Sequence, residues 1–246
     1  MAKAKKPDLT VVIPAYNEEK RLGPTLQRVC RYLEGRRTAF ELLVVDDGSR
    51  DGTAAQAMKA ARRWSSVRLI RNTFNLGKGA SVRAGVMQAR AEAVLFTDAD
   101  LSTPIEELER LWPLLGTRAE VVIGSRGLPG SRIRRRQPVY RMLMGKAFNA
   151  LVRLAAVRGL WDTQCGFKLF TRAAGQAVFP LQRVPRFGFD VEFLYLAKKM
   201  GFRVAEVPVS WENSPASTVN PIADASQMFF DLLLIRLNDW QGKYRS

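Results

Sequence analysis

The sequence contains no histidine among its 246 residues. Ser-His-Asp and Cys-His catalytic arrangements, the HExxH zinc motif and an imidazole general base are therefore excluded. Any catalysis by this chain has to depend on carboxylates, cationic side chains and a bound metal ion.

Cysteine is almost as scarce. Cys30 and Cys165 are the two cysteines, and no CxxC spacing occurs. We therefore expect neither a disulfide framework nor a thiolate metal site. The expected setting is the reducing cytoplasm. We expect Cys165 to be a small buried residue and not a nucleophile.

Long hydrophobic runs are also missing. The apolar run Leu9–Ile13 is short, and the run Met228–Ile235 is interrupted by Asp231. A membrane-spanning helix needs about 20 apolar residues, so no span is predicted. An amphipathic helix that lies on a membrane surface remains compatible with the sequence.

Acidic residues are absent between Glu120 and Asp162, in a chain whose net charge is 39 − 23 = +16. Such a balance predicts an anionic partner. The cations alternate with Met, Leu and Ala and not with stacking aromatics, which favours a membrane surface over nucleic acid. A solvated loop is the alternative. The stretch contains nine cations: Arg126, Arg132, Arg134, Arg135, Arg136, Arg141, Lys146, Arg153 and Arg158.

The first half of the chain alternates apolar, β-rich runs with segments of helical periodicity, which predicts an α/β fold with a mostly parallel sheet flanked by helices. The predicted strands are 9–13, 40–45, 67–71, 93–96 and 120–123, and the predicted helices are 22–33, 53–64, 78–90 and 104–115. The later segments favour an arginine-rich loop at 132–136, helices at 139–157, 188–200 and 223–240, and an extended run at 203–209. We divide the chain into a main domain, 1–218, which includes the interface helix 139–157, and a C-terminal amphipathic helix and tail, 219–246.

Two carboxylates, Asp98 and Asp100, follow the predicted strand 93–96. Alternate residues of an extended chain face the same way, so both can bind Mg²⁺ or Mn²⁺ while substrate phosphates complete the coordination. The alternative is a polar turn before a helix that Ser102 or Thr103 caps.

Two further loops follow predicted strands. Asp46 and Asp47 end the strand 40–45, where a carboxylate can accept hydrogen bonds from a base or a ribose, although Asp-Gly alone explains a turn. Lys78 lies in the segment NLGKGA, whose glycines and cation at a helix start suit an anion. This segment is neither a Walker loop nor a full GxGxxG motif.

Five motifs taken together resemble the family 2 glycosyltransferases of GT-A fold: VVIPAYNE, VVDDGSRDGT, NLGKGASVRAG, FTDADLST and GSR. The segments DTQCGFKLFTR, FGFDVEFLYLAKKMG and QMFFDLLLIRL resemble more narrowly the dolichyl-phosphate β-glucosyltransferases and their bacterial polyprenyl-phosphate relatives. The resemblance covers nearly the whole chain.

This resemblance implies transfer of a sugar, foremost glucose from UDP-glucose, to a polyprenyl monophosphate with inversion at the anomeric carbon. The expected setting is the cytoplasmic face of a membrane, with a peripheral enzyme and Mg²⁺ or Mn²⁺ as cofactor. The implied site residues are Pro14, Tyr16, Glu18 and Asp46 in the nucleotide pocket, Lys78 beside the nucleotide, Asp98 and Asp100 as the metal-binding DxD motif, and Arg126 and Arg141 at the acceptor phosphate.

Two departures from the family pattern bear on these expectations. Ser102 stands where the mannosyl-phosphate members have a metal-binding Gln, which favours the glucosyl branch. The membrane span that precedes the eukaryotic glucosyl members is missing from this sequence, so we expect amphipathic helices to provide any anchoring.

Three alternatives stay open. A GDP-mannose-dependent polyprenyl-phosphate mannosyltransferase would use the same chemistry, and a non-catalytic basic protein would bind RNA or membranes without a sugar nucleotide. A transferase to a hydroxyl would need a working base, for which Asp190 is the residue to test. A phosphate monoester needs none, because it is already ionised at neutral pH.

Overall fold

A computed structural model describes residues 6–135, 152, 156–212 and 221–245 of the chain. Its centre is a seven-stranded sheet in the order β3-β2-β1-β4-β7-β5-β8. Its strands are β1 (Leu9–Ala15), β2 (Phe40–Asp46), β3 (Val67–Arg71), β4 (Ala93–Thr97), β5 (Val121–Ser125), β7 (Phe167–Thr171) and β8 (Val204–Pro208).

Every strand of this sheet is parallel to the others except β7, which runs antiparallel between β4 and β5. The mostly parallel sheet predicted from the sequence is thereby confirmed. The chain segment that forms β7 was not predicted as a strand, and its insertion joins two sets of parallel strands into one sheet.

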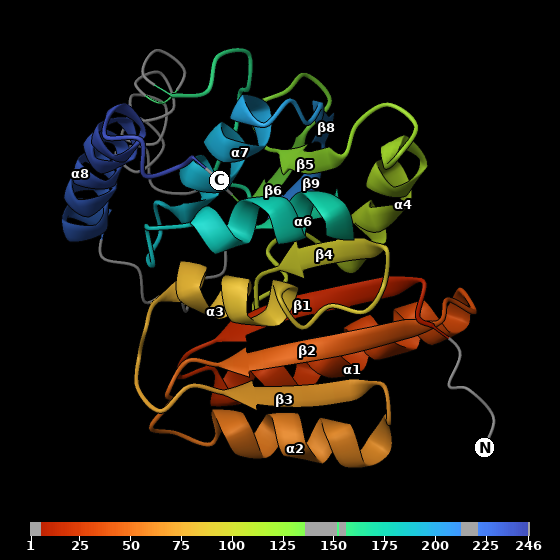
Figure 1. The fold of residues 1–246 in the computed structure, drawn as a ribbon. Coiled ribbons are helices and arrows are strands. Elements are labelled where there is room, and N and C mark those ends of the chain that lie inside the picture. The colour runs from red at the N-terminus through yellow and green to blue at the C-terminus, as the bar shows by residue number, and fades with distance from the viewer. Residues whose placement is uncertain (1–5, 136–151, 153–155, 213–220, 246) are drawn as a thin grey trace.

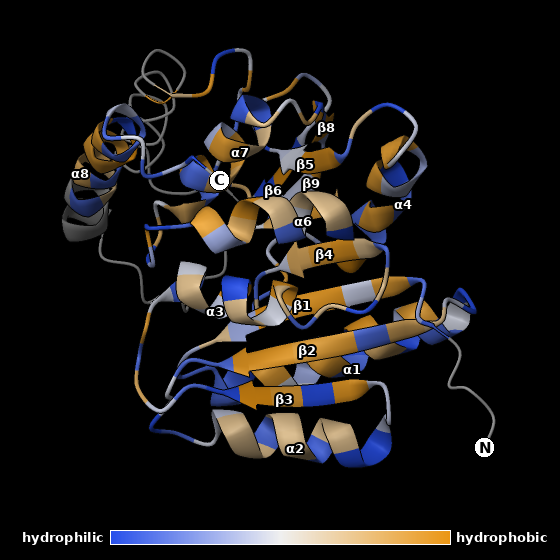
Figure 2. Cartoon of the chain, viewed as in Figure 1, coloured by the Kyte–Doolittle hydropathy of each residue, from blue (hydrophilic) through white to orange (hydrophobic). Residues whose placement is uncertain are grey.

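Helices cover both faces of the sheet (Figure 1). Alternate residues of β1 face opposite ways, so Val11 and Ile13 lie in one core cluster and Val12 in the other. The orange strands in Figure 2 reflect this burial on both sides. The first face carries α1 (Glu19–Gly35), α2 (Thr53–Arg63) and α4 (Leu108–Leu111), and the second carries α3 (Lys78–Val86), α6 (Arg172–Val178), α7 (Phe189–Lys199) and α8 (Pro221–Trp240).

Three predicted elements need correction. The helix predicted over 78–90 ends at Val86. The helix predicted over 104–115 is instead two 3₁₀ turns, 105–107 and 112–114, around the short α4. Pro113 explains part of this, because a proline lacks the N–H that a continued α-helix requires. The arginine run 132–136, predicted as a loop, contains β6 (Arg132–Arg135), which pairs in parallel with β9 (Ser210–Glu212).

The predicted C-terminal helix is present as α8. Its inner side buries Leu232 and Ile235 in the second core cluster, and Tyr244 beyond the helix lies in the same cluster. Most of the predicted helix 139–157, with Arg141 and Lys146, lies outside the described residues, as does the proposed domain boundary at 218. Within the part of the chain that the structure describes, no helix has the length and hydropathy needed to cross a membrane.

Candidate active site

The carboxyl ends of the parallel strands meet at one edge of the sheet, toward which the arrows of β2, β3 and β4 point in Figure 1. The loops after β1, β2, β4 and β5 therefore gather there, as is typical of ligand sites in α/β folds. Because β7 is antiparallel, it begins at this edge, and Phe167 lies opposite Thr97. The segment before β7 is thus brought beside the loop that carries Asp98.

Because Gly166 has no side chain, the Asp98 carboxylate can lie directly against it. The Asp98 amide donates a hydrogen bond to the Gly166 carbonyl at 3.2 Å. A Cβ atom on Gly166 would lie only 1.9 Å from Asp98 Oδ2. Glycine is therefore required at this position if Asp98 is to keep its place. The sequence signal for this was the segment DTQCGF, but nothing in its spacing connects Gly166 with Asp98.

Asp100 lies close to two other acids. Burial raises the pKa of Asp100, and the negative charge of Asp98 adds to the effect, while the Ser102 amide donates to Asp100 Oδ1 at 3.0 Å. Burial likewise raises the pKa of Glu18, with smaller contributions from Asp100 and Asp98, although Arg21 bonds both Glu18 oxygens at 2.6 Å. Asp98, Asp100 and Glu18 thus repel one another, which a bound cation would relieve.

The residues present fit a Mg²⁺ or Mn²⁺ ion. Asp98 and Asp100 offer the hard carboxylate oxygens that these ions prefer, and such ions commonly take one or two carboxylates plus substrate phosphates. Within the described residues, no group of three or more His, Cys, Asp or Glu side chains is arranged to hold a metal. Asp98 and Asp100 are therefore the two residues that would hold such an ion.

Lys78, the first residue of α3, reaches across to the DxD motif. Its Nζ lies 2.7 Å from Asp98 Oδ1 and 5.2 Å from the centre of the Phe96 ring. Burial alone would lower the pKa of Lys78, but Asp98, Asp190 and Asp100 raise it above the ordinary value. Lys78 is therefore a charged side chain at neutral pH, and it is bound to one of the proposed metal ligands.

Asp190, at the start of α7, has a cationic partner of its own. Lys168 of β7 donates to Asp190 Oδ1 and to the Cys165 carbonyl, both at 2.6 Å. The Lys168 and Asp190 side chains are 1% and 5% exposed. Burial raises the pKa of Asp190, while Lys168 and Lys78 oppose that effect. The Asp190 carboxylate is buried and bound to Lys168, and its use as a base stays a prediction.

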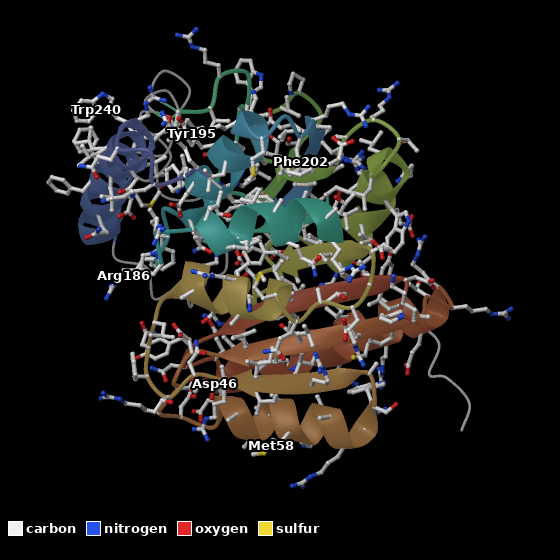
Figure 3. All side chains as sticks on the ribbon, viewed as in Figure 1. Asp46, Met58, Arg186, Tyr195, Phe202 and Trp240 are labelled. Carbon is white, nitrogen blue, oxygen red and sulfur yellow. The ribbon has the colours of Figure 1, made fainter. Side chains whose placement is uncertain are left out.

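A hollow of 480 Å³ lies beside the ends of β1, β2 and β3. Tyr16, 41% exposed, forms one wall. Asp46, labelled at the end of β2 in Figure 3, is fully buried beneath it and accepts hydrogen bonds from the Ser49 amide and from Arg71 Nε. The residues around the hollow are Tyr16, Gly48, Ser49, Arg50, Arg71, Asn72, Thr73, Phe74 and Asn75.

The predicted nucleotide residues thus have different surroundings. Pro14 is buried in β1 opposite Val45, so it shapes the strand end and exposes no polar group. Tyr16 is accessible, whereas both Asp46 oxygens already accept bonds from the protein. The predicted roles of Pro14, Tyr16 and Asp46 at a nucleotide stay predictions.

Asp47 and Asn17 position backbone segments of the site, a role that the sequence did not predict for either residue. Asp47 accepts hydrogen bonds from the Leu76 and Gly77 amides at 3.0 and 2.8 Å, which fixes the loop before Lys78. Asn17, with a φ of 54°, accepts from the Arg50 amide at 3.0 Å. Asparagine tolerates this left-handed conformation better than most residues. The motifs contained both residues, but only the fold shows what they hold.

Arg126 is bound to a buried acid. Its Nε and Nη2 donate to the two oxygens of Asp162 at 2.6 and 2.8 Å, and its guanidinium carbon lies 5.5 Å from the Trp211 ring centre. Burial would raise the pKa of Asp162, but Arg126 lowers it below the ordinary value. Asp162 thus neutralises much of the charge that Arg126 was predicted to offer an acceptor. Its predicted partner Arg141 lies outside the described residues.

Comparison with known proteins identifies the family of this chain. The family model described as glycosyl transferase family 2 matches residues 10–179. The chain belongs to glycosyltransferase family 2. It is therefore a glycosyltransferase, as the motifs predicted, and the non-catalytic alternative is not supported.

Individual relatives show which members of the family this chain is similar to. A dolichyl-phosphate β-glucosyltransferase of Trichomonas vaginalis is 40% identical over 93% of this chain and 70% of that protein. The human dolichyl-phosphate β-glucosyltransferase is 38% identical over 96% of this chain and 77% of that protein. The resemblance to these glucosyltransferases, first inferred from three motifs, is confirmed along nearly the whole chain.

Solved structures of two glycosyl-phosphoglycerate synthases share the fold at low identity. Glucosyl-3-phosphoglycerate synthase of Mycobacterium tuberculosis, in complex with Mn²⁺, UDP-glucose and phosphoglyceric acid, superimposes with a TM-score of 0.67. It is 20% identical and the match covers 93% of this chain and 79% of that one. Mannosyl-3-phosphoglycerate synthase of Rubrobacter xylanophilus gives 0.66 at 20% identity over 98% of this chain and 76% of that one. These likenesses confirm the GT-A fold.

Proposed function

We propose that this glycosyltransferase moves glucose from UDP-glucose to the phosphate of a polyprenyl monophosphate, with inversion, at the cytoplasmic surface of a membrane. The observation that carries this proposal is the identity of 33% to 40% with dolichyl-phosphate β-glucosyltransferases over nearly the whole chain. A hollow of 480 Å³ lies at the same edge of the sheet as the DxD motif, and it supports a nucleotide-sugar donor because this volume is in the range of small-molecule sites.

The surroundings of Asp190 favour a phosphate acceptor over a hydroxyl. A hydroxyl acceptor must lose a proton to a general base, whereas a phosphate monoester is already anionic at neutral pH. Asp190, the acid considered for that task, is buried and bound by Lys168. The chain has no histidine to replace it. An acceptor that needs no base is therefore the better match to these residues.

Asp98 and Asp100 are the residues that would hold Mg²⁺ or Mn²⁺, and the metal supplies neutralisation of the charge on the departing diphosphate. Tyr16 and the loop after β2 would contact the nucleoside. Arg126, aligned by Asp162, and Arg141 would orient the acceptor phosphate toward the anomeric carbon. Glu18 is held by Arg21 beside the DxD motif and would limit the space available to the donor.

A membrane surface as partner is supported by α8. Its outer side carries six exposed apolar side chains, and Trp240, 84% exposed, projects from the outer end of the helix in Figure 3. The acid Asp231 on the same helix is buried. An exposed apolar face suits the headgroup layer, where the phosphate of a lipid acceptor lies. The six are Phe229, Phe230, Leu233, Leu234, Leu237 and Trp240.

The first experiment is a transfer assay with purified protein, UDP-glucose and a polyprenyl phosphate in detergent. We expect glucose to enter the organic phase with Mg²⁺ or Mn²⁺ and not with EDTA. Transfer from GDP-mannose in place of UDP-glucose would assign the mannosyl alternative. Transfer to a lipid or glycan hydroxyl without dependence on lipid phosphate would contradict the proposed acceptor.

The same assay tests the proposed role of Arg141 at the acceptor phosphate. Arg141→Ala is expected to raise the lipid phosphate concentration needed for half-maximal rate more than that of UDP-glucose. Arg158→Ala removes an exposed charge from the same basic stretch and is the matched control. Equal effects of Arg141→Ala on both substrates would argue against a role at the acceptor.

A further inference from the structure

Lys78 forms an ion pair with Asp98, one of the two carboxylates proposed to bind the metal. Its Nζ lies 2.7 Å from Asp98 Oδ1, and the two side chains are 22% and 31% exposed. A divalent cation that approaches Asp98 at this oxygen therefore meets an ammonium group already bound there. Like charges at such a separation repel one another, so cation binding to Asp98 requires Lys78 to move.

The groups around Lys78 offer its ammonium group few alternative anionic partners. Its ammonium group lies against the Phe96 and Phe189 rings, at 5.2 and 6.0 Å from their centres. The nearby Asp190 is already bound by Lys168 at 2.6 Å. When Lys78 leaves Asp98, its charge is left without a full partner unless an anion enters the site.

The backbone of Lys78 is fixed, so any movement is confined to its side chain. Asp47 holds the Gly77 amide at 2.8 Å. On the other side, a Cβ atom on Gly79 would lie 2.5 Å from the Cβ of Phe189, which shows how closely the start of α3 packs on α7. Lys78 is thus a mobile cation on a rigid backbone.

We propose that Lys78 is a displaceable counter-ion of the DxD motif that makes metal binding depend on the nucleotide diphosphate. Without nucleotide, Lys78 neutralises Asp98 and opposes the metal. A diphosphate gives the ammonium group an alternative anionic partner, which releases Asp98. Metal and nucleotide then bind more tightly together than separately, and by linkage each strengthens the other by the same factor. This inference rests on the metal-binding role of Asp98 in the proposed function, and it makes Lys78 a positioning residue.

The proposal gives Lys78 variants an unusual signature. Lys78→Met removes the competing charge while it keeps the aliphatic side chain. We expect Mn²⁺ to bind the nucleotide-free Lys78→Met protein about five- to tenfold more tightly than the unaltered protein. UDP should then increase the Mn²⁺ affinity of the variant by a correspondingly smaller factor. Lys78→Gln should behave in the same way, and Lys78→Arg should restore much of the competition.

The measurement is a titration of Mn²⁺ into nucleotide-free protein, with free Mn²⁺ followed by its electron paramagnetic resonance signal, and then a repeat with saturating UDP. Lys59→Met, which removes an exposed lysine on α2, controls for the loss of one positive charge. Asp98→Asn shows how much of the signal depends on the DxD motif. Thermal unfolding of each variant verifies that it is folded.

Two outcomes would overturn the inference in different ways. If Asp98→Asn weakens Mn²⁺ binding but Lys78→Met and Lys78→Gln leave it unchanged or weaker, the metal assignment stands and the role of Lys78 is wrong. If Asp98→Asn has no effect on Mn²⁺ binding, both the metal assignment and the inference fail. The titration of the nucleotide-free protein uses neither donor nor acceptor, so an error in the proposed substrates leaves that result unaffected. If the donor carries guanine in place of uracil, only the repeat with UDP changes, and GDP then takes its place.

Discussion

Two lysine–aspartate pairs lie against the same aromatic ring and differ in almost everything else. Lys78 Nζ and Lys168 Nζ are 5.2 and 5.8 Å from the centre of the Phe96 ring. The Lys78–Asp98 pair is 22% and 31% exposed, whereas the Lys168–Asp190 pair is 1% and 5% exposed. A partly exposed pair can exchange partners with a ligand, while a buried pair has no replacement for either charge. The Lys78–Asp98 pair is therefore suited to ligand binding, and the Lys168–Asp190 pair is suited to stabilising the fold.

The largest effect is expected from Asp98→Asn, which removes the acid of the exposed pair. Loss of the metal's charge stabilisation, worth several kcal/mol, should lower kcat/KM for glucose transfer by about a thousandfold. The free energy of unfolding should change by less than about 1 kcal/mol, because the pair is partly solvated.

Transfer rates and urea unfolding test this prediction. Asp8→Asn, at the opposite end of β1, is the control, since Asp8 is exposed and bonds only the Ala39 amide among the contacts described. Full activity of Asp98→Asn would refute the metal assignment.

Lys168→Met tests the buried pair. The substitution leaves the Asp190 carboxylate buried without its cation, which should lower the free energy of unfolding by about 3 to 5 kcal/mol. Urea unfolding measures the loss. The double variant Lys168→Met with Asp190→Leu should recover most of it, because no uncompensated charge remains. A loss of less than about 1 kcal/mol for Lys168→Met would show that the two pairs do not differ as described.

Gly166→Ala sharpens the comparison by displacing Asp98 without changing any charge. The added Cβ would lie 1.9 Å from Asp98 Oδ2, so the carboxylate or the backbone has to shift. Misplacement of a supporting position typically costs 10- to 100-fold, and we expect about that loss of transfer rate and of Mn²⁺ affinity. Gly35→Ala is the control, since nothing lies within 4 Å of a Cβ there. Unchanged Mn²⁺ affinity would argue that Asp98 does not need its observed position.

The smallest effect is expected at a third, surface pair. Arg203 lowers the pKa of Glu120 from its ordinary 4.5 to about 2. Because the folded-state pKa is depressed, the pair stabilises the fold above about pH 4.5, and this contribution disappears as the pH falls toward 2. Glu120→Gln should cost less than about 1 kcal/mol at pH 6, since exposed pairs contribute little.

Urea unfolding at pH 6 and at about pH 2 measures that difference. High salt should reduce the cost of Glu120→Gln at pH 6 through screening. A cost that persists at pH 2 would mean that the charge of Glu120 is not its source.

Much of the fold was predictable because strand and helix periodicity is local. The strands 9–13 and 40–45 and the helices 53–64 and 223–240 were found within a few residues of their bounds. The helix over 104–115 was wrong because apolar spacing was given more weight than Pro113. The strand within 132–136 was missed because its partner, 210–212, lies far away in the sequence.

The sequence by itself determined that acids follow parallel strands, that no histidine serves as a base, and that the last helix is amphipathic. These properties depend on residue identity and local spacing. Only the tertiary structure decided which charge meets which. Insertion of β7 between β4 and β5 brings Gly166 to Asp98 and Lys168 to Asp190. Such pairings depend on how distant segments are placed in three dimensions. Burial then determines whether an ion pair can exchange its partner for a ligand or stays paired as long as the protein is folded.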